Sequence, residues 1–206
     1  MYRSSAWILT ALTLLVPFKA TAQSAQAVSV QVSGLYNVVF GNLFDALNLK
    51  NGIGGEAQIR YTPGALSFGL GVQYTVHDRP QVNDEEPESL NLRLYGPFIE
   101  PRYRIHTGSN VWAPYLSARF SLLKIGFSEP GFDLSSSFIQ INGGGGLLYR
   151  LSSRVNLDMG ATFGYNQLGS GTLEFESGTS KTSVPVDVRS GANLVGRVGF
   201  AFGIGG

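Results

Sequence analysis

The amino-acid sequence predicts an all-β protein, an eight-stranded antiparallel up-and-down β-barrel that crosses a membrane. Three observations support this prediction. About eight segments alternate apolar and polar residues with a period of two, which is the periodicity of β-strands. Most of these segments are about ten residues or longer, well beyond the usual strand length of about five or six residues. The connections between them alternate between long and short along the chain, which is typical of membrane barrels.

The composition of the 206-residue chain agrees with this fold class. Charged residues make up 14% of the chain, against roughly 25% in ordinary soluble domains, and glycine is about twice as frequent as usual. Aromatic residues reach 12%, yet the mean hydropathy is only +0.07. Such values indicate apolar and polar positions that cancel when averaged, rather than a helical membrane protein. The chain has no cysteine, which excludes disulfides and thiolate metal sites.

The first 22 residues are predicted to be a signal peptide. Arg3 supplies the positive start, residues 7–18 supply a short apolar core, and Ala20-Thr21-Ala22 matches a cleavage site. A single membrane anchor is the alternative, but a spanning helix needs about 20 apolar residues. Removal of Arg3 and Lys19 leaves 13 basic and 14 acidic residues, so no basic excess indicates nucleic-acid binding. Residues 23–27 are then a short N-terminal segment, and residues 28–206 form the barrel domain.

The clearest strands form a hairpin over residues 138–165, joined by the short turn Ser152-Ser153. The other strands are predicted over residues 28–40, 53–61, 66–77, 90–105, 112–122 and 193–204. Residues 42–51, 78–89, 126–136 and 168–187 are expected to be long loops. In residues 90–105 the apolar parity switches at Gly96-Pro97, and a β-bulge there is expected because proline cannot donate to a ladder.

The apolar parity of the strands is expected to face lipid. A secreted lipocalin-like barrel, with this parity turned inward around an apolar ligand, is the alternative. Large aromatic residues near both strand ends favour the membrane barrel, because aromatic belts mark the two bilayer interfaces. The belt expected at the short-turn end comprises Tyr61, Tyr103, Trp112, Tyr149 and Phe202. The belt expected at the long-loop end comprises Phe40, Tyr74, Phe120 and Tyr165.

The chain resembles the small eight-stranded outer-membrane β-barrel proteins of Gram-negative bacteria, the outer membrane protein β-barrel domain family with its OmpA-like and OmpX-like members. The resemblance rests on the strand pattern, on segments 100–103 and 113–116, and on the Gly-rich strand around Gly143-Gly146. It implies a location in the cell outer membrane, contact with outer-membrane lipid and lipopolysaccharide, and assembly by the barrel-assembly machinery. That machinery would read Phe200 and Phe202, because the chain does not end on phenylalanine. A monomer is expected.

The polar parity is expected to collect charged side chains in the lumen. These residues are Glu56, Arg60, Glu100, Arg102, Arg119, Asp158 and Arg197. Charges in a narrow lumen need partners, so a network of salt bridges and hydrogen bonds is predicted. The network would either plug the barrel or act as a gate in a narrow pore. Eight strands leave an interior just wide enough for side chains, which favours the plug.

Nothing in the sequence indicates an enzyme, a metal or a cofactor. His77 and His106 lack the placement that a lipid-hydrolysing barrel would need, and Gly143-Gly146 lacks the Lys-Ser/Thr of a phosphate loop. The expected role is structural, adhesive or one of surface interaction, with a surface ligand bound by the extracellular loops. The alternatives are a narrow pore for small solutes and, more weakly, the secreted lipocalin-like barrel.

Overall fold

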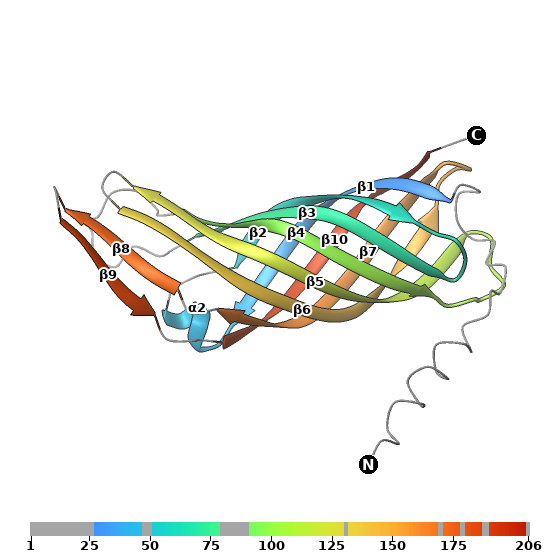
Figure 1. Cartoon of the computed structure of the whole chain (residues 1–206). Helices are drawn as coiled ribbons and strands as arrows, with labels where there is room; N and C mark the ends of the chain where they lie inside the picture. The colour runs from blue at the N-terminus through green and yellow to red at the C-terminus, as the bar shows by residue number, and fades with distance from the viewer. Residues whose placement is uncertain are drawn as a thin grey trace, which may run out of the picture.

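The computed structural model describes residues 27–46, 51–78, 91–129, 132–168, 171–177, 180–186 and 190–204. Almost all of them are in strands (Figure 1). The elements are β1 (Val28–Phe40), α2 (Asn42–Ala46), β2 (Gly52–Tyr61), β3 (Leu66–Asp78), β4 (Asn91–Arg104), β5 (Trp112–Glu129), β6 (Phe132–Arg150), β7 (Val155–Leu168), β8 (Gly171–Ser177), β9 (Ser180–Val186) and β10 (Ser190–Ile204). The predicted signal peptide, over residues 1–22, lies outside the described residues.

Eight of the described strands close into an antiparallel barrel, as the sequence predicts. Their order around the wall is β1-β2-β3-β4-β5-β6-β7-β10, and β10 pairs with β1 to close the ring. Following paired residues once around the wall leads from Val30 to Phe40, a stagger of ten residues. With ordinary strand dimensions, this stagger tilts the strands by about 40° from the barrel axis. A tilted strand of about ten residues then spans an apolar layer of about 25 Å.

The two ends of the barrel differ, and we call them the short-turn end and the long-loop end. The connections 62–65, 105–111 and 151–154 and the strand ends Val28 and Ile204 lie at the short-turn end. At the long-loop end, on the left of Figure 1, strands β1, β3, β5 and β7 end and strands β2, β4, β6 and β10 begin. The expected loop 78–89 falls almost entirely outside the described residues.

Three segments expected to be loops are more regular than predicted. Residues 42–51 include the short helix α2, whose Phe44 and Asp45 amides donate to the Gly41 carbonyl. Residues 126–136 are mostly strand, because β5 and β6 remain paired as far as Glu129 and Phe132. The segment 168–187 contains the hairpin β8–β9, which pairs with β6 through Phe132 and Phe175. The sheet therefore continues beyond the barrel, where β6 pairs with both β5 and β8, and β8 pairs with β9.

The expected β-bulge at Gly96-Pro97 is wrong. The register of β4 against β3 is unbroken from Leu66↔Tyr103 to Asp78↔Asn91, and the register against β5 is the same on both sides of Pro97. The apparent switch of parity has another cause. Leu92, Leu94 and Phe98 are buried on the same inward side as Glu100 and Arg102. The lumen itself is apolar at the long-loop end, so its lining does not read as polar in the sequence.

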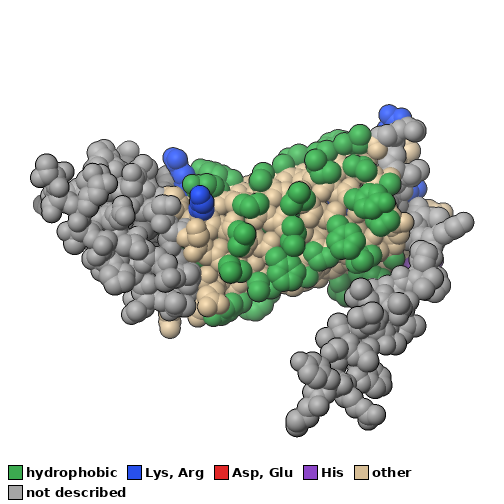
Figure 2. All heavy atoms as spheres, in the orientation of Figure 1, with side chains coloured by type: hydrophobic (Ala, Val, Ile, Leu, Met, Phe, Trp, Pro, Cys, Tyr) green, Lys and Arg blue, Asp and Glu red, His purple; other side chains and the backbone are tan. Residues whose placement is uncertain are grey.

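The outer wall is apolar over its middle. Figure 2 shows hydrophobic side chains along the visible wall, with Lys and Arg only near its two ends on this face. Outward side chains such as Leu70, Val72, Leu122 and Phe163 are between 60% and 64% exposed. Soluble monomers rarely expose apolar area on this scale, and together with the long tilted strands it marks a surface that lipid covers. The lipocalin-like alternative, with the apolar face inward, is therefore wrong. The described part of the chain contains no helix long and apolar enough to cross a membrane.

Candidate functional site

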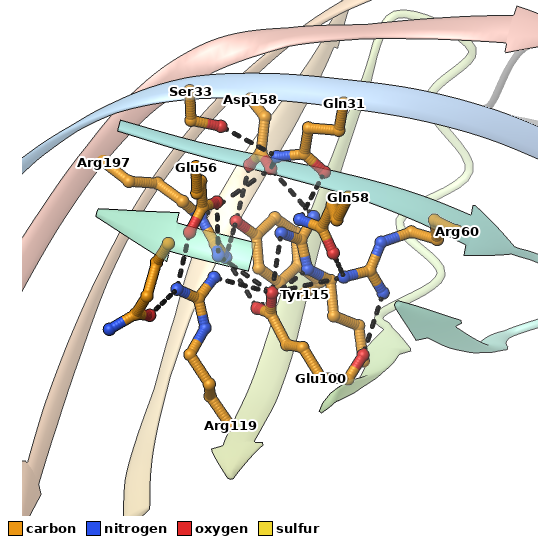
Figure 3. A network of polar contacts seen from close by, with 12 residues as sticks. Gln31, Ser33, Glu56, Gln58, Arg60, Glu100, Tyr115, Arg119, Asp158 and Arg197 are labelled. Carbon is orange, nitrogen blue, oxygen red and sulfur yellow. Dashed lines mark hydrogen bonds and ion pairs between the residues drawn. The ribbon is translucent and has the colours of Figure 1, made fainter. Parts of the chain in front are cut away.

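The lumen collects side chains from all eight barrel strands in three layers. An apolar layer lies at the long-loop end, a layer of amide side chains lies beneath it, and a layer of charged side chains lies in the middle of the barrel. All seven charged residues named from the sequence are at most 5% exposed, and they form one connected network (Figure 3). The inward parity of each strand places them there, because alternate residues of a strand share a face.

Glu100 on β4 is the centre of the charged layer. Its carboxylate lies within 3.3 Å of Arg60 Nη2, 3.1 Å of Arg102 Nε and 2.9 Å of Arg119 Nη2. Arg197, on the opposite wall, completes the set with Nη2 at 2.9 Å from Glu100 Oε1. Four guanidinium groups on four strands therefore surround one carboxylate (Figure 3). Burial of a carboxylate carries a desolvation cost, which these charge-assisted hydrogen bonds offset.

Glu56 and Asp158 are the other two anions of the layer. Glu56 Oε2 accepts from Arg119 Nη1 at 2.5 Å, and Arg197 Nη1 lies 3.6 Å from Oε1. Asp158 Oδ2 accepts from Arg102 Nη1 at 2.8 Å and also from the Gln31 amide. The four arginines and three carboxylates leave a net charge of +1. Each anion is bonded to strands that are not its neighbours, so the network ties distant parts of the wall together.

Tyr115 is a further member of this network, beyond the residues predicted from the sequence. Its hydroxyl donates to Asp158 Oδ1 at 2.5 Å and accepts from Arg197 Nη2 at 2.9 Å. The Arg102 guanidinium lies over its ring, 4.4 Å from the centroid. A Cβ at Gly146 or Gly160 would come within 2.3 Å or 2.7 Å of the hydroxyl, so these glycines make room for it. The signal was present in the sequence, because Tyr115 shares its parity with Ser117 and Arg119.

A chain of amide side chains forms the second layer. Asn193 Nδ2 donates to Asn37 Oδ1 at 3.3 Å, Asn166 Nδ2 donates to Asn193 Oδ1 at 3.1 Å, and Gln140 Nε2 donates to Asn166 Oδ1 at 2.9 Å. Gln73 continues the chain, donating to Gln140 and accepting from Arg119 Nη1 at 3.2 Å. The amides therefore connect five strands to the charged layer. Each amide side chain can both donate and accept, so one amide can follow another along a chain of hydrogen bonds.

The apolar layer is a plug at the long-loop end. It contains Phe44, Leu92, Leu94, Leu123, Ile125 and Phe138, all at most 5% exposed. Phe44 comes from α2, so the helix after β1 contributes its side chain to the cluster. The plug could not be predicted from the sequence, because residues 42–51 were expected to be a loop, the strand before Leu123 was expected to end at Leu122, and the apolar side of residues 90–94 was expected to face lipid.

The nine aromatic residues predicted as belts all lie on the outer wall. Their exposed fractions run from 40% for Tyr103 to 53% for Tyr61. The short-turn group is Tyr61, Tyr103, Trp112, Tyr149 and Phe202, and the long-loop group is Phe40, Tyr74, Phe120 and Tyr165. At the short-turn end, Trp112 pairs directly with Tyr149. At the long-loop end, successive strand pairs lead from Phe120 through Ile141, Tyr165 and Ala192 to Phe40. Their assignment to the bilayer interfaces is a proposal that rests on this placement.

The lumen does not offer a metal site among the residues that the structure describes, where no group of His, Cys, Asp or Glu is arranged to hold an ion. His77 is fully buried in the amide layer, with Nε2 3.4 Å from Asn37 Nδ2 and 3.3 Å from Thr75 Oγ1. His106 is exposed in the connection between β4 and β5. The two histidines therefore lie near opposite ends of the barrel.

Comparisons with known proteins agree with this architecture. Among curated proteins, none matches the sequence. Neisserial surface protein A has the same fold, with 22% identity, a TM-score of 0.57, and coverage of 86% of this chain and 97% of that one. OprG of Pseudomonas aeruginosa is 12% identical with a TM-score of 0.51, covering 89% and 98% of the two chains. A major outer membrane protein of Thermus thermophilus is 16% identical with a TM-score of 0.51, covering 85% and 98%.

The sequence profile of the outer membrane protein β-barrel domain matches residues 8–184, which is most of the chain. The profile, the closed eight-stranded barrel and the apolar outer wall agree with one another. The chain belongs to the outer membrane protein β-barrel domain family.

Proposed function

We propose that this outer-membrane barrel is a surface-interaction protein, which acts through the strands and loops at its long-loop end. The observation that carries the proposal is an asymmetry between the two ends. The short-turn end has connections of four to seven residues, whereas β5, β6, β8 and β9 form a four-stranded continuation at the other end (Figure 1). In membrane barrels of this kind, short turns face the periplasm and long loops face outward.

The filled lumen supports a role at the surface rather than in transport. Phe44 and its apolar neighbours close the long-loop end, and the charged layer below is bonded across the barrel in several directions. A steady solute path would require several buried side chains to move together. The proposal also includes export by the predicted signal peptide, assembly by the barrel-assembly machinery, and action as a monomer without a catalytic step.

The orientation is tested with epitope tags on intact cells. One tag is inserted between Ser177 and Ser180, and a matched tag is inserted at Ser152-Ser153 in the short turn. We expect antibody to label only cells that carry the first tag, while both tagged proteins migrate as folded barrels on unboiled gels. Labelling of the short-turn tag alone would reverse the orientation.

The surface role is tested by removing the β8–β9 hairpin. A variant lacking residues 171–186 keeps the pairing of β7 with β10, which ends at Gln167↔Ser190. We expect cells that express this variant to lose adhesion to epithelial monolayers and to one another, relative to cells with the full chain. Equal adhesion by both, together with reproducible single-channel steps of the full chain in planar bilayers, would replace the surface role with a narrow pore.

A further inference from the structure

The short-turn end of the lumen is lined by cations and carries no acidic residue among those that the structure describes. Arg104 on β4 and Arg150 on β6 face inward there, by the parity of their strands. Arg154 and His106 are exposed in the connections beside them. Outside the charged layer, the described acidic residues lie on α2 or at and beyond the long-loop ends of the barrel strands, and they are Asp45, Asp78, Glu129, Asp133, Glu174 and Glu176. The two ends of the barrel therefore differ in charge.

Arg104 is a buried cation with few partners. Its side chain is 5% exposed, and its Nη2 donates to the carbonyl oxygen of Gly64 in the connection between β2 and β3. Its Nε and Nη1 have no hydrogen-bond partner among the described residues. By contrast, each arginine of the charged layer contacts at least one carboxylate. Burial of a guanidinium without acceptors carries a desolvation cost, and an anion beside Arg104 would offset that cost.

A hydroxyl without a partner lies at the same corner of the barrel. Thr62 Oγ1 is buried and makes no hydrogen bond to a described residue, whereas Thr62 N donates to the Ala27 carbonyl at 2.7 Å. Thr62 begins the connection between β2 and β3, and Arg104 N donates to the carbonyl of Ala65 at its end at 2.8 Å. The hydroxyl and the guanidinium therefore belong to the same part of the rim. Together they offer O–H and N–H donors that no acceptor of the described chain uses.

The charge of the lumen also favours an anion at this end. Among the described side chains, six arginines and three carboxylates face the lumen, which leaves a net charge of +3. The three carboxylates all belong to the charged layer in the middle of the barrel, so Arg104 and Arg150 below it carry the excess. In a narrow space between low-dielectric walls, the field of such charges is focused toward the opening. An anion that approaches the short-turn end from water meets this field.

Water, rather than lipid, leads to this part of the rim. Arg104 is on the inward parity of β4, whereas its neighbour Tyr103 is 40% exposed on the outer wall. A lipid headgroup lies outside the wall, on the side of Tyr103. The opening is also narrow, because eight strands leave an interior just wide enough for side chains. A small solute fits such an opening, whereas a folded domain is too large for it.

We propose that the short-turn mouth of the barrel binds one small oxyanion, a phosphate or carboxylate group carried by a water-soluble solute. Arg104 donates to its oxygens through Nε and Nη1, Thr62 donates through its hydroxyl, and Arg150 adds a second positive charge two strands away. Guanidinium groups suit such oxyanions through charge-assisted hydrogen bonds. The charged layer stays closed above the site, so the solute binds in the mouth without crossing the lumen. Its arrival from the periplasm rests on the orientation proposed above.

The test follows anion binding to the purified full-length barrel in zwitterionic detergent micelles, by NMR titration of the arginine Nε–H signals. The probes are sodium phosphate and sodium succinate, each compared with sodium chloride at equal ionic strength. The variants are Arg104→Gln and Thr62→Val. Their matched controls are Arg93→Gln, exposed at the long-loop end, and Thr107→Val, exposed in the connection between β4 and β5. Lipid nanodiscs with and without phosphatidylglycerol test a lipid phosphate as the source of the anion.

We expect the Arg104 Nε–H signal to shift with phosphate or succinate but not with chloride, and the anion with the lower Kd identifies the bound group. Arg104→Gln should raise that Kd about tenfold or more, because hydrogen bonds between charged groups are the strong ones. Thr62→Val should raise it about threefold, for the loss of one neutral donor. Arg93→Gln and Thr107→Val should leave it unchanged.

An unchanged Kd in Arg104→Gln, or an equal shift with chloride, overturns the site. If Arg104→Gln does not fold, Thr62→Val decides, since an unchanged Kd there overturns the site as well. A shift that requires phosphatidylglycerol and is absent with both soluble anions overturns the water-soluble ligand. Because the assay uses purified protein, its outcome does not depend on which end of the barrel faces the periplasm.

Discussion

Glu100 and Arg197 bond across the full width of the barrel, with Arg197 Nη2 2.9 Å from Glu100 Oε1 and Nη1 3.0 Å from Oε2. β4 and β10 are four strands apart in a ring of eight, so these residues stand on opposite walls. A bidentate pair of this kind fixes both distance and direction. With three further arginines on the same carboxylate, the lumen is held by its side chains as well as by the strand ladders.

Replacing Glu100 by Gln is expected to destabilise the barrel strongly. The amide keeps the shape of the side chain but leaves four guanidinium groups with only two carboxylates between them. Breaking a buried ion pair from one side costs about 3–5 kcal/mol. The free energy of unfolding in urea, measured in lipid vesicles, reports the effect. Asp45→Asn, whose side chain is exposed on α2, is the control and should change this free energy by less than about 0.5 kcal/mol. Equal urea unfolding midpoints for E100Q and the original chain would show that the network does not depend on the Glu100 carboxylate.

Arg119→Leu and Arg197→Leu should each lower heat stability. Among the described residues, Arg119→Leu leaves Glu56 with Arg197, at 3.6 Å, as its remaining ion-pair partner, so we expect it to be the costlier change. The double variant Glu56→Leu with Arg119→Leu removes the stranded charge as well and should recover part of the loss. The temperature at which the barrel loses its unboiled mobility measures each effect. Unchanged folding and heat stability in both single variants would refute the network.

Phe44→Ala tests the apolar plug. Removal of a buried phenylalanine from a packed cluster costs about 3–5 kcal/mol, so the unfolding midpoint should fall. Conductance in planar bilayers should remain absent, because the amide and charged layers still fill the lumen beneath. The matched control is Phe40→Ala, whose ring is 45% exposed on the outer wall. Single-channel steps in Phe44→Ala alone would show that the plug, rather than the charged layer, closes the barrel.

The lipid-facing wall is tested by placing one arginine at two depths. Val72→Arg puts the charge on the middle of the wall, where it should cost about 2–4 kcal/mol, whereas Ile204→Arg near the short-turn end should cost about 0–1 kcal/mol. Both original side chains are outward, at 60% and 53% exposed. Reversible unfolding in vesicles gives both values. Similar costs at the two positions would mean that the free-energy cost of arginine does not depend on depth, which contradicts a wall embedded in a bilayer.

The strands of the barrel could be predicted because most of them pair a uniform apolar face with a polar one. β7 is an example, since Leu157, Met159 and Phe163 alternate with Asp158 and Thr162. Prediction failed where the lumen side of a strand is apolar. In β4 and β5 the inward residues Leu92, Leu94, Leu123 and Ile125 alternate with outward residues that include the charged Arg93 and Lys124, so parity no longer separates lumen from lipid. A bulge and a loop were expected in place of two long, regular strands.

The composition of the charged layer could also be predicted, because every member shares the polar parity of its strand. Its pairing could not, because the partners of Glu100 come from β2, β4, β5 and β10. Which charges meet depends on the ten-residue stagger of the wall, and no single strand contains that information. Tyr115 shows the same limit, since its place beside Asp158 depends on Gly146 and Gly160 of two other strands.

Membrane fractionation combined with heat-modifiability tests the central claim, a closed barrel embedded in the outer membrane. The full-length chain, expressed in a Gram-negative host, should be recovered from the outer-membrane fraction. On a gel it should migrate faster unboiled than boiled, because the closed strand ladder resists detergent until heated. Recovery in the soluble periplasmic fraction, without a shift on boiling, would contradict the account.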